Sequence, residues 1–165
     1  MLLDELESEP KATVGRLEAV YRRHAGTKRF TRELAEAVAS GSATLERAGA
    51  WLLRKQADAA GGLPAGDWAV ALDGLGGVTA WEARLELCQM LAAHPELFDA
   101  APTDVAEFLR DCARDAKPFV RAWAVTAFHG LGKRHAAFRA EARRLVAAAR
   151  KDPAKSVQAR LRHLK

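Results

Sequence analysis

Basic side chains are concentrated at one end of this 165-residue chain. Residues 116–165 contain 13 Lys and Arg but only two acidic residues, Glu141 and Asp152, a net charge of +11. Residues 1–115 contain 13 basic and 19 acidic residues, a net charge of −6. Clustered cations bind phosphates by releasing condensed counterions, and arginine can also fork onto two anionic oxygens. The division predicts an acidic partner for the basic end, unless it only reflects a solvated face in an arginine-rich chain.

The candidate contact residues lie on the last helices and the loop before them. Arg139, Arg143 and Arg150 fall on one flank of a helix predicted at 136–151, while Arg144 points away from its apolar stripe. Only Phe138 supplies an aromatic ring nearby, so base stacking is not expected. The complete predicted surface comprises Arg121, Lys133, Arg134, Arg139, Arg143, Arg144, Arg150, Lys155, Arg160 and Arg162.

Patterns that signal catalysis or metal binding do not occur. The five histidines never pair at i, i+4 and never stand beside a cysteine or acid at metal-ligand spacing. The glycine-rich stretch at 74–77 lacks the Lys-Ser/Thr of a phosphate-binding loop, and no nucleophile elbow or kinase signature is present. Cys88 and Cys112 lack CxxC spacing and are expected to be core residues in a reducing compartment. We therefore expect a non-enzymatic protein without metal or cofactor.

The N-terminus and the apolar runs bear on localisation. Residues 1–5 are acidic where a signal peptide is basic and then apolar. Charged residues interrupt every apolar run, so no segment is expected to cross a membrane. These features predict a cytoplasmic protein.

A period of 37 residues organises the elements that must position these side chains. Arg47, Arg84 and Arg121 follow one another at this step, and a further step reaches Gln158. Four columns of apolar residues repeat with the same period: Ala50, Leu87, Ala124 and Leu161; Leu53, Met90, Ala127 and Leu164; Ala35, Leu72, Leu109 and Val146; and Val38, Leu75, Cys112 and Ala149. A fixed period of this length, built from two helices, is typical of an α-solenoid, which presents an extended surface to partners.

Apolar residues recur at three- and four-residue steps throughout, and no alternating β-branched run predicts a strand. Helices are predicted at 11–25, 28–40, 43–59, 65–75, 79–94, 102–115, 118–132, 136–151 and 153–164, while residues 1–10 fray or form a short leading turn. Thr79 with Glu82 forms a potential capping box. Pro102 and Pro118 open helices, and Asp152 before Pro153 is a further predicted start.

Residues 115–131 carry a recognisable pattern. Asp115, Val120-Arg121, and the spaced Ala124, Ala127, Phe128 and Leu131 resemble the second helix of a HEAT repeat. The resemblance extends over roughly residues 28–165, strongly in this repeat and more weakly in the others. It implies a right-handed stack of antiparallel helix pairs whose second helices line a concave face. It also implies a ladder between adjacent repeats that involves Asp115 and Arg121, and macromolecular binding.

The tryptophans allow one further comparison. DNA alkylation-repair glycosylases built on HEAT-like solenoids hold a damaged base with concave-face tryptophans, an aspartate and an arginine. Trp68 and Asp73 share one segment here, and Arg121 lies on a concave-type helix, but the Trp-Trp-Asp cluster of those enzymes is missing. Core packing is the simpler interpretation of Trp51, Trp68 and Trp81.

The sequence thus predicts an all-α, right-handed α-α superhelix of about four helix pairs plus a leading helix. It would form one HEAT-like domain over 1–165, with repeats at roughly 28–59, 65–94, 102–132 and 136–165. The expected function is a non-catalytic scaffold that binds a protein partner or self-associates. The alternative is nucleic-acid binding through the basic C-terminal half, with glycosylase-like base repair as one form of it.

Overall fold

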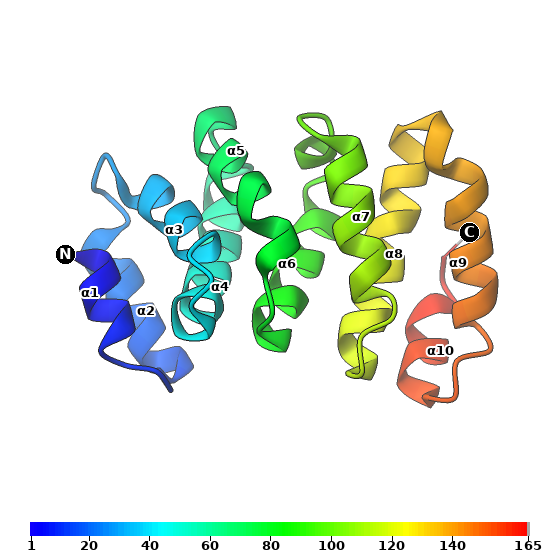
Figure 1. Cartoon of the computed structure of the whole chain (residues 1–165), viewed down its shortest axis with the longest axis horizontal. Helices are drawn as coiled ribbons and strands as arrows, with labels where there is room; N and C mark the ends of the chain where they lie inside the picture. Colours follow the sequence, from blue (N-terminus) through cyan, green and yellow to red (C-terminus); the bar gives the residue numbers. More distant parts are fainter. Residues whose placement is uncertain (165) are drawn as a thin grey trace. The chain divides into compact units, whose positions relative to one another are not determined.

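The computed structural model of the chain describes residues 1–164. These residues form ten α-helices joined by short turns and three single turns of 3₁₀ helix, and no β-strand occurs among them (Figure 1). The predicted all-α class is therefore confirmed. The helices group into two compact units, Met1–Leu87 and the residues from Cys88 onward, and the boundary falls within one helix, α6 (Trp81–Ala93). The single domain and the repeat boundaries remain predictions.

The first unit is built around a close helix pair. Its elements are α1 (Leu2–Glu7), α2 (Val14–His24), α3 (Phe30–Val38), α4 (Ala43–Ala60), α5 (Ala65–Gly74), a 3₁₀ turn η1 (Leu75–Gly77) and the start of α6. Gly49 of α4 lies so close to α3 that a Cβ added there would stand 2.7 Å from the Cβ of Ala37. Because only glycine permits this approach, the backbones of α3 and α4 pack together directly.

Of the two expectations for the N-terminal residues, fraying or a short leading turn, the second is the closer one, because these residues form a short helix. Residues 2–7 form α1, and Leu2 and Leu6 are each only 2% exposed. The helix packs against α3 and α4, which bury its apolar side. Burial of two leucines, worth about 1.5–3 kcal/mol each, explains why this acidic segment folds.

The start of α6 is capped from outside the helix. The sequence predicts a start at Thr79, but α6 begins at Trp81. The main-chain N–H groups of Thr79 and Ala80 both donate to Glu46 Oε2 of α4, each at a distance of 3.0 Å. Glu46 is completely buried, so α4 supplies the carboxylate that these N–H groups would otherwise lack.

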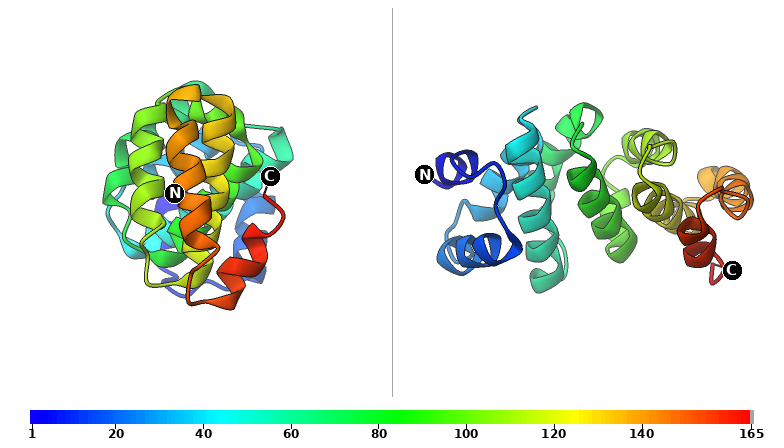
Figure 2. Two further views of the ribbon diagram at one scale, coloured as in Figure 1. Left: turned by 90° about the vertical axis from the view of Figure 1, so that its right-hand side faces the viewer. Right: turned by 90° about the horizontal axis from the view of Figure 1, so that it is seen from below.

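The second unit alternates helices in two layers. After the end of α6 come η2 (Pro95–Phe98), α7 (Pro102–Cys112), α8 (Pro118–Arg134), η3 (Ala136–Phe138), α9 (Arg139–Ala149) and α10 (Lys155–Leu161). Consecutive helices run antiparallel, with α7 and α9 on one side of the unit and α8 and α10 on the other (Figure 2). Each element packs on its neighbour in sequence, and α10 also packs along α8.

Three predicted helix starts in this unit can be checked. Pro102 and Pro118 begin α7 and α8 as predicted. The predicted start at Asp152–Pro153 is wrong, because α10 begins two residues later, at Lys155. The carboxylate of Asp152 instead accepts the N–H of Ala154 over 2.8 Å and shapes the turn before the helix.

The columns with the 37-residue period form the core. Ala50, Leu87, Ala124 and Leu161 are each completely buried. Among the twelve positions of the other three columns, all are buried except Leu72 and Leu164, which are half-buried. The period therefore marks interior positions in both units.

Candidate functional site

A groove on the second unit gathers four of the predicted contact residues. It has a volume of about 440 Å³ and lies between the C-terminal part of α8 and one face of α9, with Leu164 at its edge. Gly132 sets the spacing of its walls, because a Cβ at this position would lie 2.6 Å from the Cβ of Ala142. The two helices thus approach each other closely at Gly132.

The floor of this groove is apolar and made of small side chains. Gly132, Ala142, Val146 and Ala147 contribute to it, together with Leu164. Gly132, Ala142 and Val146 are themselves buried, whereas Ala147 is exposed to solvent. A floor of this kind accepts an apolar side chain or a closely approaching backbone.

The rim of the groove is cationic. Lys133 lines it from α8, and Arg139, Arg143 and Arg150 line it from α9; His129 also contributes, and no acidic residue does. The three arginines lie at steps of four and seven residues, which places them along one face of α9. Three of these cations, Lys133, Arg139 and Arg143, are exposed and form no hydrogen bond or ion pair with residues 1–164. Arg150 donates to the Leu164 carbonyl at a distance of 2.8 Å. We call this feature the α8–α9 groove.

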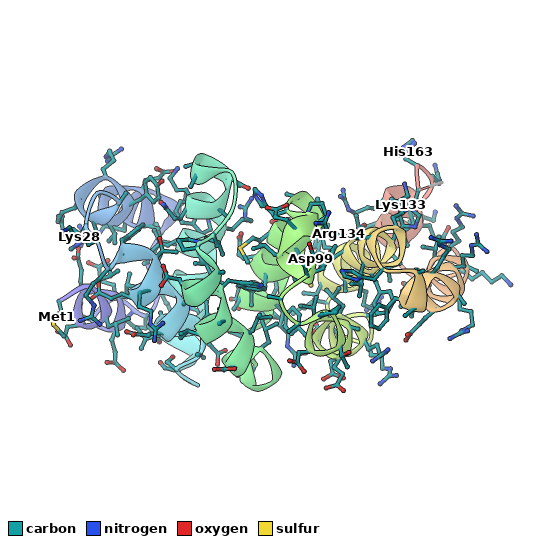
Figure 3. All side chains as sticks on the ribbon, turned by 90° about the horizontal axis from the view of Figure 1, so that it is seen from above. Met1, Lys28, Asp99, Lys133, Arg134 and His163 are labelled. Atoms are coloured by element: carbon teal, nitrogen blue, oxygen red, sulfur yellow. The ribbon has the colours of Figure 1, made fainter. Side chains whose placement is uncertain are left out.

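Three other predicted contact residues remain exposed but lie outside the groove. Arg144, Lys155 and Arg162 form no hydrogen bond or ion pair within the described part of the chain. Nitrogen-tipped side chains extend outward from α9 in Figure 3. Together with the rim, these residues leave the second unit rich in uncompensated positive charge.

Arg121 uses its charge inside the unit instead of at the predicted surface. Its guanidinium donates to both carboxylate oxygens of Asp152, each at a distance of 2.9 Å, and to the main-chain carbonyls of Asp115 and Ala116. The side chains of Arg121 and Asp152 are only 18% and 12% exposed. Hydrogen bonding to Arg121 lowers the pKa of Asp152, so both charges persist near neutral pH.

Arg134 is also occupied by an acidic residue. It donates to both carboxylate oxygens of Asp99, the residue that follows η2, and His135 Nε2 lies 2.9 Å from Asp99 Oδ1. These hydrogen bonds, chiefly the one from Arg134, lower the pKa of Asp99 to about 2. Figure 3 shows Arg134 beside Asp99, with the neighbouring Lys133 drawn apart from them. Only Lys133 of this pair therefore serves the groove.

Arg160 packs against an aromatic ring. Its guanidinium carbon lies 3.1 Å from the ring centroid of Trp123, where the side chain is half-buried. Burial lowers the pKa of Arg160, and its Nε is enclosed without a hydrogen-bond partner. The predicted contact residue thus fastens α10 to α8 through a cation–π contact.

Three members of the column with 37-residue spacing, Arg84, Arg121 and Gln158, share one structural role that the sequence did not reveal, whereas Arg47 binds the Pro10 carbonyl instead. Arg84 donates to the main-chain carbonyl of Val78, and Arg121 donates to that of Asp115. Each acceptor lies six residues before its donor, at a distance of 2.9 Å. Gln158, the next member of the column, likewise donates to the main-chain carbonyl of Asp152 at 2.7 Å. The recurring donor closes the turn that precedes its helix, and the constant spacing of six residues was the available signal.

A second cavity, of about 480 Å³, lies in the first unit. The ammonium of Lys55 stands 4.9 Å from the ring centroid of Tyr21 and 5.6 Å from that of Trp51, and it pairs with Glu18 at 2.8 Å. The Tyr21 hydroxyl donates to Gln56 over 3.0 Å. The ammonium of Lys55 therefore already occupies the aromatic cluster. In the sequence, only the 37-residue step from Glu18 to Lys55 could have indicated this cluster.

The described residues offer little for catalysis or base recognition. No group of three or more His, Cys, Asp or Glu residues within 1–164 is arranged to hold a metal ion. Cys88 and Cys112 are buried and form no disulfide, as expected of core residues. Trp68 is a core residue at 2% exposed, so its ring is inaccessible to a base, whereas Trp81 is 39% exposed and corrects its predicted core position.

Two further searches concern membrane-spanning helices and similarity to known proteins. Within residues 1–164, no helix has the length and apolar character needed to span a bilayer. Comparison with known proteins found no matching family model, no matching curated sequence and no matching solved structure.

Proposed function

We propose that the chain is a non-catalytic binding module built as a HEAT-like, right-handed α-solenoid. Three features support this architecture: antiparallel helix pairs within the second unit, burial of columns spaced by 37 residues, and a turn-closing donor repeated in the same column. The ion pair between Arg121 and Asp152 supports the HEAT resemblance, since Asp152 stands one period after Asp115. Helical-repeat proteins of this type present surfaces to macromolecules.

The partner proposed here is a protein with an acidic surface, bound through the second unit. The observation that carries this proposal is the α8–α9 groove, whose cationic rim surrounds an apolar floor without any acidic residue. Protein partners bury apolar anchors surrounded by polar contacts, so they use both parts of such a groove. Phosphate backbones use only the cations.

Nucleic-acid binding is the second candidate. Arg144, Lys155 and Arg162 favour it, because they are exposed, lie outside the groove and form no hydrogen bond or ion pair within residues 1–164. Contact with about five phosphates would give a log–log salt slope near −4.5 on duplex DNA. Burial of Trp68 weakens the base-repair form of this candidate.

One comparison separates the two. A variant with Arg143, Arg144, Lys155 and Arg162 changed to glutamate reverses four exposed charges and leaves Arg121, Arg134 and Arg160 in their internal contacts. Immobilised wild-type and variant proteins would be exposed to nuclease-treated cell extract at ~0.2 M salt, and both would be titrated with a 20-base-pair duplex at ~50 and ~200 mM salt.

The proposal expects acidic proteins that the wild type retains and the variant does not, with duplex binding confined to low salt. Retention that is equal for the two proteins would exclude the basic surface as the binding site. Duplex binding with the steep salt slope, and no protein retention, would establish the nucleic-acid alternative instead.

A further inference from the structure

The last helix of the second unit is much shorter than the helix beside it. α8 has 17 residues and α10 has seven. At 1.5 Å per residue these lengths are roughly 25 Å and 10 Å, so α10 leaves about 15 Å of α8 uncovered. The contacts of α10 fix which part is covered: Arg160 stands over Trp123, and Gln158 binds the turn that precedes α10.

The α8–α9 groove coincides with the uncovered part of α8. The residues that α8 contributes to it, His129, Gly132 and Lys133, all come from its C-terminal half, beyond Trp123. Leu164, three residues after the end of α10, lies at the edge of the groove. The groove therefore continues the course of α10 past its last turn.

We propose that the α8–α9 groove binds an acidic amphipathic α-helix of a partner protein, about three turns long, that lies in line with α10. This inference rests on the proposed function and specifies the partner. The bound helix would complete the layer of α8 and α10. Helix-in-groove recognition of this kind uses apolar anchors at i, i+3, i+4 and i+7.

The dimensions and charges of the groove define the ligand. Arg139 begins α9 and Arg150 follows its last residue, a separation of 11 residues or about 16 Å, which matches the length of α8 that α10 leaves uncovered. Arg143 lies between them and Lys133 faces them from α8, so acidic residues are required on both flanks of the bound helix. Charge complementarity of this kind selects an acidic helix over a neutral or basic one.

The floor of the groove suits a helix more than an extended polyanion. Gly132, Ala142 and Ala147 have side chains no larger than a methyl group, so a partner helix can come close to α8 and α9. Leu164 and Val146 supply apolar contacts for its anchor residues. A phosphate chain would leave this apolar surface unused.

The probe for this inference is a fluorescein-labelled synthetic peptide of 15 residues. It carries leucine at i, i+3, i+4 and i+7 positions and glutamate on the flanks, and a second peptide contains the same residues in scrambled order. Binding to the full chain is measured by fluorescence anisotropy at ~0.15 M salt, and peptide helicity by circular dichroism.

Two pairs of variants provide matched controls. Arg143→Glu changes the groove, while Arg144→Glu makes the same charge change at the next residue, outside it. Ala147→Trp fills the groove, while Ala148→Trp adds the same side chain at an exposed position that does not line it. All four positions are exposed, so the fold should persist, and thermal unfolding of each variant checks this.

The expected result is that the amphipathic peptide becomes helical on binding and that the scrambled peptide binds at least tenfold more weakly. Arg143→Glu and Ala147→Trp should each weaken binding at least tenfold, and their controls by less than threefold. Equal binding of the two peptides, equal effects of Arg143→Glu and Arg144→Glu, or unaltered binding to Ala147→Trp would overturn the groove assignment. So would absence of binding at ~100 μM peptide, or displacement of the peptide by duplex DNA at this salt. The proposed function would still stand if the four-charge variant lost its acidic proteins in the capture experiment.

Discussion

The ion pair between Arg121 and Asp152 allows a quantitative test of how the second unit is held together. Replacement of Asp152 by alanine removes both carboxylate contacts of Arg121 and the acceptor for the Ala154 N–H. Arg121 then keeps only the carbonyls of Asp115 and Ala116. The turn that leads into α10 loses its main anchor to α8.

The expected cost lies between the values for exposed and buried ion pairs. Exposed pairs contribute about 0–1 kcal/mol, and loss of one partner of a fully buried pair costs about 3–5 kcal/mol. The two side chains are 18% and 12% exposed and meet through two parallel hydrogen bonds, so we expect Asp152→Ala to destabilise by about 2–3 kcal/mol. The coupling energy between Arg121→Ala and Asp152→Ala should be about 1–2 kcal/mol.

Urea unfolding followed by circular dichroism measures these values, with Arg144→Ala as the control. Arg144 is exposed and forms no ion pair within residues 1–164, so its loss should change stability by no more than about 0.5 kcal/mol. A coupling energy indistinguishable from zero, or an Asp152→Ala cost no larger than that of the control, would contradict this account of the unit.

The same pair predicts a pH dependence. Because the folded-state pKa of Asp152 is lowered, its contribution is present above the unfolded pKa, near 4, and is lost as pH falls below that value. Stability of the wild type should therefore decrease between about pH 5 and pH 2 more steeply than that of Asp152→Asn. Parallel acid limbs for the two proteins would show that the carboxylate is not the group responsible.

Three further predictions concern packing, each measured by chemical unfolding. Gly132→Val should lower the free energy of unfolding by at least about 1–3 kcal/mol, because even a Cβ there would stand 2.6 Å from that of Ala142. Gly66→Ala, which has nothing within 4 Å of the added Cβ, should be neutral or stabilising. Similar losses for the two variants would contradict the close approach of α8 and α9. Glu46→Ala should cost about 2–4 kcal/mol by leaving two main-chain N–H groups at the start of α6 without their acceptor, and a loss below 1 kcal/mol would mean that water replaces it. Leu87→Ala should cost about 2–5 kcal/mol because the side chain is completely buried, and a loss below 1 kcal/mol would contradict its place in the core.

Periodicity allowed the interior of the molecule to be predicted from sequence. Helices bury apolar residues at three- and four-residue steps, and the 37-residue period indicated which positions are completely buried, such as Leu87 and Ala124. At the N-terminus the sequence left fraying and a short leading turn open, because acidic residues surround Leu2 and Leu6 there. Their burial depends on α3 and α4, which local sequence does not reveal.

The candidate site was predicted only in part, because net charge does not show which charges are already paired. Lys133, Arg139, Arg143 and Arg150 do line one groove, but Arg121 and Arg134 are held by acidic residues 31 and 35 positions away in sequence. Only the fold brings such partners together. The groove itself lies between helix ends, and the boundaries of helices are difficult to predict.

The stacking of Arg160 on Trp123 has a spectroscopic consequence. Trp51, Trp68 and Trp81 belong to the first unit, and Trp123 is the single tryptophan in residues 88–165. A triple phenylalanine variant of the first three would confine indole emission to the second unit. With a guanidinium 3.1 Å from its ring centroid, the Trp123 indole should change its fluorescence as soon as α10 separates from α8. The chain thus contains a natural optical probe for one of its two units, at the contact between α8 and α10.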